Sequence, residues 1–277
     1  MRLRATLIAG LAGALLTAQP LAAQEHGGGP KPELQSWSFA GPFGKYDRNQ
    51  LQRGFQVFSE VCANCHSANL LTFRNLSQPG GPEYSEDQVR QLASTFIVVD
   101  PEDPLSDRPA VPADAWPWRF RTATEARDLN NGVVPPDFSV IAKARSVSFD
   151  FPYWIFNYFT AYQEGGPDYI YNLMIGYHDT APEGVSLAPG QSYNDFFPGH
   201  LLAMPRTLFD GVVNYDGDDF PETTEQYAAD VSAFLMWVAD PHLGERKAIG
   251  FRVMAFLILF TVLMYLTYRR VWKGVAH

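Results

Sequence analysis

The sequence predicts a mainly α-helical protein with long loops and one C-terminal transmembrane helix. Three observations support this class. Short segments place apolar residues at helical spacing. The chain contains 22 glycines and 21 prolines, yet 46% of its residues are hydrophobic, which is typical of a loop-rich but packed domain. The C-terminal region holds a long, almost wholly apolar run. No clear run of alternating residues predicts a strand, and 277 residues suffice for one large domain or two small ones.

The N-terminus has the features of a secretory signal. Arg2 and Arg4 precede a short apolar run at 5–18, and small residues at 22–23 suit cleavage after Ala23. Residues 1–23 are therefore predicted to be a signal peptide. The exported domain then covers residues 24–247, with a flexible start at 24–32 that is rich in glycine and proline.

The C-terminus is predicted to anchor the protein. The run at 249–268 has about the twenty residues that a membrane-crossing helix needs. Arg252 near one end can reach the headgroups, and Trp272 suits the opposite interface. We expect an anchor helix at 248–268 and a cytoplasmic tail at 269–277. The protein is then a single-pass protein of the bacterial inner membrane, with its exported domain on the periplasmic side.

Within the exported domain, apolar spacing and cap residues predict helices at 49–61, 122–130, 167–176 and 223–239. Thr223 and Gln226 are expected to form a capping box at the start of the last of these, and Pro241 to end it. Surface loops are expected at 100–117 and 180–205, where proline, glycine or aspartate are frequent.

The charge of the exported part is strongly negative. Residues 24–247 hold all 30 acidic residues of the chain but only 15 of its 21 basic ones, so nucleic acid is not an expected partner. Such a surface favours a basic partner, although solubility alone could explain it. Two acidic clusters stand out, Asp100-Glu102-Asp103 and Asp216-Asp218-Asp219-Glu222.

The segment Cys62-Ala63-Asn64-Cys65-His66 follows the pattern C-x-x-C-H, which is the attachment motif of c-type haem. Two thiols one helical turn apart can each add to a vinyl group of the same porphyrin, and the next residue places an imidazole at the iron. The motif predicts one covalently bound haem c, attached at Cys62 and Cys65 and ligated by His66.

Three alternatives compete with this interpretation. A structural zinc site needs four ligands, and the chain has no other cysteine. A redox disulfide between Cys62 and Cys65 would be expected within a thioredoxin-like pattern, which is not evident here. The motif could also occur by chance. Export and the adjacent His66 favour the haem.

The sixth ligand of the iron decides between electron transfer and an open reactive site. Met204 lies at the end of a loop rich in proline and glycine, which could present its thioether. Met174 and Met236 lie in apolar segments and are expected in the core. A core role for Met204, or ligation by a histidine, stays open on these residues alone; the candidate histidines are His178, His200 and His242.

Several further segments resemble the cytochrome c1 family, the haem subunits of quinol–cytochrome c oxidoreductase (the bc1 complex). The resemblance is spread over most of the expected mature chain. It rests on the segments QRGFQV (52–57), CANCHS (62–67), NNGVVPPDFS (130–139), AKAR (142–145), GGPDY (165–169), GVSL (184–187), YNDFFPG (193–199) and DVSAFL (230–235).

The resemblance implies a cytochrome c-like haem domain in which Met204 is the second axial ligand. It also implies that Arg145 lies by a haem propionate and Tyr169 near the haem. The chain would be an electron-transfer subunit that is not catalytic alone and passes electrons from the Rieske iron–sulfur protein to a cytochrome c. The implied partners are cytochrome b, the Rieske protein, a soluble or anchored cytochrome c, and the membrane.

The chain departs from the family pattern at three places. Arg206 and Thr207 follow Pro205 where further prolines are usual, Phe138 replaces a usual leucine, and residues 149–162 look like an insertion. Haem attachment at both cysteines would exclude the extra disulfide of some relatives. Two other functions remain alternatives: an open-site haem enzyme or gas sensor, and an anchored cytochrome outside any complex.

Overall fold

The computed structural model describes residues 32–103, 105–147, 165–215, 217 and 220–274. The expected signal peptide, nearly all of the expected flexible start and the 149–162 insertion lie outside the described residues. The same holds for Asp216, Asp218 and Asp219 of the second acidic cluster.

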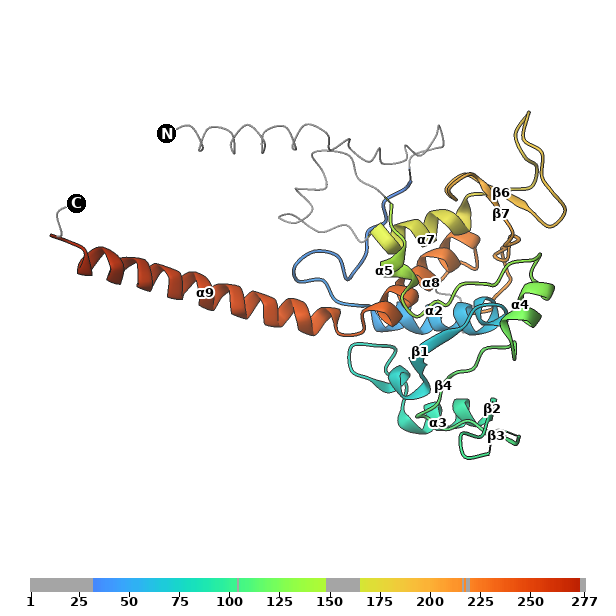
Figure 1. The fold of residues 1–277 in the computed structure, drawn as a ribbon, viewed down its shortest axis with the longest axis horizontal. Helices are drawn as coiled ribbons and strands as arrows, with labels where there is room; N and C mark the ends of the chain where they lie inside the picture. Colours follow the sequence, from blue (N-terminus) through green and yellow to red (C-terminus); the bar gives the residue numbers. More distant parts are fainter. Residues whose placement is uncertain (1–31, 104, 148–164, 216, 218–219, 275–277) are drawn as a thin grey trace, which may run out of the picture. The chain divides into compact units, whose positions relative to one another are not determined.

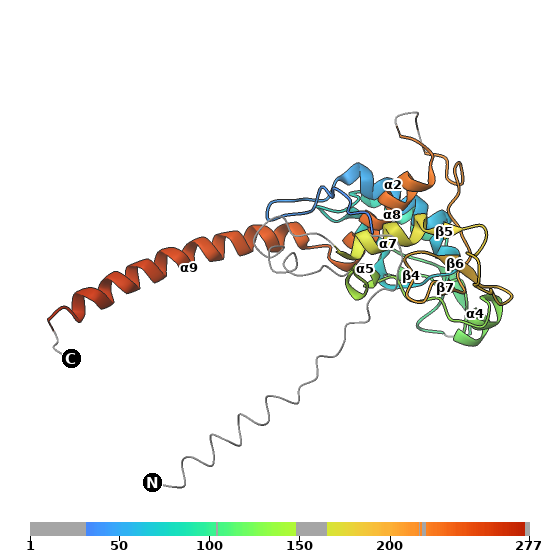
Figure 2. The same ribbon diagram turned by 90° about the horizontal axis from the view of Figure 1, so that it is seen from above.

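Four predicted helices are confirmed. They are α2 (Arg48–Glu60), α4 (Ala123–Leu129), α7 (Gly165–Ile175) and α8 (Thr224–Ala239). Helix α8 packs against α2, α7 and the short helix α5 (Ile141–Ala144), as both views of the ribbon show (Figures 1 and 2).

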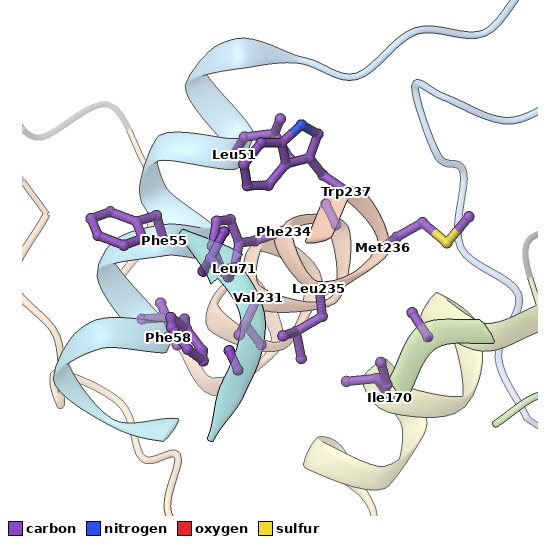
Figure 3. Packing of buried hydrophobic residues seen from close by; sticks show 14 of the residues in the cluster. Leu51, Phe55, Phe58, Leu71, Ile170, Val231, Phe234, Leu235, Met236 and Trp237 are labelled. Carbon is purple, nitrogen blue, oxygen red and sulfur yellow. The ribbon is translucent and has the colours of Figure 1, made fainter. Parts of the chain in front are cut away.

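The core lies mainly between α2 and α8. Leu51, Phe55 and Phe58 of α2 belong to one buried cluster with Phe234 and its neighbours on α8, and Leu51 lies beside Trp237 (Figure 3). The ring centroids of Phe55 and Phe58 lie 5.6 and 5.4 Å from that of Phe234. The two helices approach so closely that a Cβ atom at Gly54 would lie 2.1 Å from the carbonyl oxygen of Asp230. Glycine is thus required at position 54 because no side chain would fit there.

The capping box expected at the start of α8 is only half present. The Thr223 hydroxyl accepts a hydrogen bond from the Gln226 amide at 3.4 Å, as expected. The Gln226 side chain, however, donates to Asp230 Oδ2 at 3.0 Å and is thereby directed along α8. The charged carboxylate is a stronger acceptor and draws Gln226 away from the helix terminus.

The strands of the structure were not predicted. Within the described residues, three small antiparallel sheets form: β1 (Ala68–Thr72) with β4 (Ala115–Trp116), β2 (Ile97–Val99) with β3 (Asp107–Pro109), and β5 (Tyr177–His178) with β6 (Ser192–Asn194) and β7 (Leu201–Leu202). The regions 100–117 and 180–205 are therefore partly ordered into strands. Strands of two to five residues are too short to produce an alternating pattern in sequence.

Helix α3 (Glu86–Ser94) was not predicted. Its sequence is amphipathic, with Val89 and Ala93 on the buried side. A cap signal was also present, since Ser85 and Gln88 form a reciprocal capping box. Two short 3₁₀ helices, η1 (Cys62–Asn64) and η2 (Phe73–Ser77), complete the domain.

The anchor is a single long helix, α9 (Leu243–Val271), which is long and apolar enough to cross a membrane. It starts ahead of the apolar run, and its first turns contact the domain. The Arg246 guanidinium pairs with Asp240, and Lys247 Nζ donates to the Phe39 carbonyl at 2.5 Å. Residues 249–271 are all exposed. This part of the helix therefore presents its side chains to the bilayer or to other membrane helices.

A buried ion pair joins α2 to α8. Arg53 donates from Nε to Asp230 Oδ2 at 2.8 Å and from Nη2 to Oδ1 at 3.0 Å. Asp230 is fully buried and also accepts from the hydroxyl of Tyr215 at 3.0 Å. The Arg53 guanidinium lies 3.6 Å from the centre of the Phe220 ring. One carboxylate thereby connects both helices to the loop that precedes α8.

We expect Arg53→Met to lower the free energy of unfolding by about 3–5 kcal/mol, because it leaves the Asp230 carboxylate buried without its cation. Urea denaturation of the full chain in detergent, followed by circular dichroism, measures the change. Arg90→Met is the matched control, since Arg90 pairs with Asp87 on the surface and should contribute at most about 1 kcal/mol. Equal small losses for both variants would show that the buried pair does not stabilise the fold.

Candidate haem-binding site

The two cysteines lie in a tight turn directly after α2. The amides of Cys65 and His66 both donate to the Cys62 carbonyl, at 3.1 and 3.0 Å. Trp118 Nε1 donates to the Cys65 carbonyl at 2.9 Å, which holds the turn from the other side. Cys62 and Cys65 are not joined in a disulfide. The turn therefore presents two thiols and an imidazole in the order that the attachment motif requires.

The Cys62 thiol is in an environment that disfavours its charge. Desolvation, together with the nearby Cys65, raises the pKa of Cys62 to about 12. The neutral thiol is therefore favoured over the thiolate in this turn. A thioether carries no charge and suits this environment.

His66 is held in one tautomer by a backbone carbonyl. Its ring is buried, and Nδ1 lies 2.8 Å from the carbonyl oxygen of Pro136. A carbonyl can only accept a hydrogen bond, so Nδ1 carries the proton and Nε2 keeps its lone pair. Burial also lowers the pKa of His66, which favours the neutral form that binds metals.

Phe138 fixes the plane of the same imidazole. Its ring stacks on His66 with centroids 3.8 Å apart and planes at 19°. The Phe138 amide donates to the Ser67 carbonyl at 2.7 Å, so backbone contact reinforces the stacking. The position at which the chain departs from the family's leucine is therefore in direct contact with the predicted ligand. Neither Pro136 nor Phe138 was predicted as a site residue, although both lie in a segment that carries the resemblance.

Asp137 connects segment 130–138 by hydrogen bonds to the residues that follow the haem-attachment motif. Its carboxylate accepts from the Ser67 hydroxyl at 2.7 Å, the Asn69 amide at 2.9 Å and the Ser139 amide at 2.9 Å. Partial burial opposes the charge, but the hydrogen bonds outweigh it and lower the pKa of Asp137. The negative charge thus stays on a carboxylate whose oxygens are satisfied.

Met204 follows β7 and is partly buried against the core. The Tyr177 hydroxyl donates to the Met204 carbonyl at 3.2 Å. The side-chain Nδ2 of Asn131 donates to the Ala203 carbonyl at 2.9 Å and to the Gly190 carbonyl at 3.0 Å. Asn131 adopts a positive φ of 50°, which asparagine tolerates better than most residues. The segment 203–209, which follows β7, is called here the Met204 loop. Segment 130–138 therefore contacts both predicted ligand regions, His66 through Pro136 and the Met204 loop through Asn131.

Arg206 braces the Met204 loop where the family pattern has prolines. Its Nε donates to the Leu208 carbonyl at 3.2 Å, and its guanidinium lies 4.9 Å from the centre of the Phe209 ring. Asp179 lies 3.7 Å from Nη1. These contacts limit the conformations of the loop in place of proline rings.

Arg145 and Tyr169 are close enough to interact electrostatically. Burial raises the pKa of Tyr169, and the Arg145 charge partly offsets that rise. Burial and then Tyr169 raise the pKa of Tyr177, whose hydroxyl binds the Met204 carbonyl. The fold thus brings Arg145, Tyr169 and the Met204 loop into one neighbourhood.

The competing residues have other roles. Met174 and Met236 are buried in the core, as expected. Each of the three candidate histidines contacts a different acceptor: His178 contacts Asp195 at 2.6 Å, His200 the Asn194 carbonyl at 3.1 Å, and His242 the carboxylate of Glu245 at 3.3 Å. The described donor set therefore fits a haem c: two free thiols, an imidazole with Nε2 unprotonated and a thioether on a braced loop.

Comparison with known proteins agrees with this geometry. Residues 37–275 match the model of the Cytochrome C1 family. A cytochrome c1 of Blastochloris viridis is 47% identical over 274 residues, covering 97% of this chain and 94% of that protein. A "Cytochrome b/c1" of Bradyrhizobium diazoefficiens is 48% identical over 264 residues, which cover 94% of this chain but 38% of that longer protein.

More distant relatives extend the match beyond bacteria. A "Cytochrome b-c1 complex catalytic subunit, mitochondrial" of Candida albicans is 36% identical over 265 residues, covering 95% of this chain and 84% of that protein. The similarity is therefore continuous along the chain and includes the haem motif and the anchor. The chain belongs to the cytochrome c1 family, the redox electron-transfer subunits of the bc1 complex, whose members carry one covalently bound haem c.

Proposed function

We propose that this chain passes single electrons from a Rieske iron–sulfur protein to a cytochrome c through a haem ligated by His66 and Met204. The observation that carries the proposal is the double role of segment 130–138, which contacts His66 through the Pro136 carbonyl and the Met204 loop through Asn131. A segment that positions two ligand candidates suits a closed, six-coordinate site, and a closed site transfers electrons without binding substrate.

The residues of the chain would set the properties of the site. The bound haem supplies a reversible one-electron couple between ferric and ferrous iron. Pro136 and Phe138 hold the His66 ring in one tautomer and one plane. Residues that contact a metal ligand commonly orient it in this way. The Met204 thioether would favour the ferrous state and raise the reduction potential.

Arg145 and Tyr169 are proposed to lie along the haem. The planar guanidinium of Arg145 matches a carboxylate in two-point geometry, so a propionate is a suitable partner. A Cβ atom at Gly166, three residues before Tyr169, would lie 3.1 Å from the Arg145 carbonyl oxygen, so the two segments pack closely, which supports their placement on one side of the site.

The names of relatives support the partners and the location. Proteins named "Cytochrome b/c1" and "Cytochrome b-c1 complex catalytic subunit" match over most of this chain, and cytochrome b is therefore the proposed membrane partner. Helix α9, which is long and apolar enough to cross a membrane, supports a single-pass membrane protein. The expected signal peptide supports a bacterial inner membrane with the haem domain on its periplasmic side.

The second acidic cluster is the preferred docking region for a basic cytochrome c. It lies on the chain shortly after the Met204 loop, and Glu222 binds the Tyr215 amide at 2.9 Å. The first cluster is on the β2–β3 hairpin, where Asp100 lies 3.9 Å from Arg108, which also pairs with Asp114. Arg108 thus neutralises part of the first cluster. The loop before α8 carries four acidic residues within seven positions, Asp216, Asp218, Asp219 and Glu222.

Met204→Leu should lower the reduction potential and remove the red-edge absorption band of the ferric methionine–iron bond. Leucine keeps a similar volume, so packing changes little while the thioether is lost. Spectra and potentiometric titration of the purified full chain measure both effects. Met174→Leu is the matched control in the core. Loss of the band in Met174→Leu alone would refute the ligand assignment, and a wild-type protein without the band would favour the open-site haem enzyme or gas sensor.

Asn131→Ala should keep the methionine ligand but make it easier to displace. Loss of a hydrogen bond to the Met204 loop costs about 1 kcal/mol, which corresponds to about fivefold tighter binding of added imidazole. Spectral titration with imidazole measures this change. Asn130→Ala is the control, because the Asn130 side chain donates to the Ala126 carbonyl instead. Equal imidazole affinities for the two variants would contradict a positioning role for Asn131.

Electron delivery to a basic cytochrome c should slow as ionic strength rises, because salt screens the attraction between opposite charges beyond about 8 Å. Stopped-flow rates over a salt series measure this. The pair Asp218→Lys and Asp219→Lys should flatten the salt dependence without changing the haem spectrum. The matched pair Glu102→Lys and Asp103→Lys should leave it steep. A wild-type rate independent of salt would remove electrostatic docking from the mechanism.

A further inference from the structure

A short loop next to the membrane helix has a fully buried base. The loop comprises residues 40–44 and is called here the Phe43 loop. Phe39, at its start, has no exposed surface and stacks on Trp37 with ring centroids 5.4 Å apart. The Tyr46 ring lies 4.9 Å from Phe39 on the other side of the loop, and the Tyr46 hydroxyl donates to the carbonyl of Asp240 at 3.0 Å. Both ends of the loop are thus anchored in the core.

The loop itself is tightly closed. The Lys45 amide donates to the Ser38 carbonyl at 3.0 Å across its neck. A Cβ atom at Gly44 would lie 2.1 Å from the carbonyl oxygen of Ala40, so only glycine fits there. Pro42 restricts the backbone at the tip. These constraints define a rigid turn that holds its tip residue in one place.

The tip residue is a phenylalanine that the domain does not cover. Phe43 is 71% exposed, and its ring lies 5.5 Å from that of Phe251 in an edge-on contact. Phe251 is the third residue of the apolar run at 249–268 and is itself 60% exposed. Lys247, one helical turn earlier, donates to the Phe39 carbonyl at 2.5 Å. Two contacts therefore fix the loop relative to the first turns of the membrane-spanning part of α9.

We propose that the Phe43 loop is a second membrane contact, in which Phe43 enters the boundary between headgroups and acyl chains of the bilayer that α9 spans. The separation of the two rings is close to one helical pitch, so Phe43 lies within about one turn of Phe251 in depth. An exposed aromatic ring at that depth leaves water when α9 is inserted.

Charge near the loop supports lipid as the occupant. Lys45 directly follows the loop, and Arg246, Lys247 and Arg252 lie near the start of α9, although the exported part carries twice as many acidic as basic residues. Arg246 is paired with Asp240. Basic side chains beside an aromatic residue are typical of membrane interfaces, where they meet lipid phosphates. The loop therefore places an apolar tip beside basic side chains. This combination matches a phospholipid surface, which has an acyl interior and phosphate headgroups.

Spin labelling of the full, haem-loaded chain in phospholipid nanodiscs tests the proposal. With Cys62 and Cys65 bound to haem, Phe43→Cys introduces a thiol for a nitroxide label. The ratio of collisions with oxygen, which concentrates in lipid, to collisions with a water-soluble nickel chelate reports depth. We expect a ratio several-fold higher than for Leu105→Cys, a matched control at an exposed residue of the β2–β3 hairpin.

Two outcomes would overturn the proposal. A ratio equal to that of Leu105→Cys would place Phe43 in water. Poor access to both reagents would show that protein, and not lipid, covers the loop. Labelling of the unmodified chain with a phospholipid that carries a photoreactive diazirine on its acyl chain provides a measurement independent of any substitution. Adducts mapped to residues 40–44 are expected, and adducts confined to α9 would contradict the proposal.

Discussion

The close contact of α2 and α8 at Gly54 is the constraint on which the rest of the structure depends. A Cβ atom there would lie 2.1 Å from the Asp230 carbonyl, so the crossing exists only because residue 54 lacks a side chain. The C-terminal end of α2 leads directly into Cys62, and the end of α8 leads through Asp240 and Pro241 into α9. The same contact therefore positions both the haem-attachment turn and the membrane anchor. The buried Arg53–Asp230 pair reinforces it with charge.

Around this frame, one segment organises the candidate site. Residues 130–138 provide Asn131 to the Met204 loop, the Pro136 carbonyl to His66 and the Phe138 ring to the face of the imidazole. The two ligand candidates are 138 positions apart in the chain, and a shared third segment lets the fold hold them with few contacts. Asp137 stabilises that segment through hydrogen bonds that outweigh the cost of its partial burial. Arg206 then braces the Met204 loop where rigid prolines would be usual.

Features that depend only on neighbouring residues could be predicted from the sequence. The C-x-x-C-H motif, the apolar anchor run and the amphipathic spacing of α2 and α8 each reside within about twenty residues, and each was found where expected. Helix α3 was missed although its signals are equally local, since Val89 and Ala93 lie on one amphipathic face and Ser85 with Gln88 marks its start. The short strands were missed because two to five residues cannot establish a period.

The sequence by itself determined the attachment chemistry, the membrane anchor and the mainly helical class, because each depends on the type and spacing of neighbouring residues. Only the tertiary structure decided which atoms hold the ligand candidates. The bond from His66 to Pro136 spans 70 positions and the bond from Asn131 to Ala203 spans 72, and nothing in either local pattern specifies the partner. The exposed position of Phe43 beside Phe251 is likewise a product of packing, since it follows from how Phe39 is buried and where α9 leaves the core.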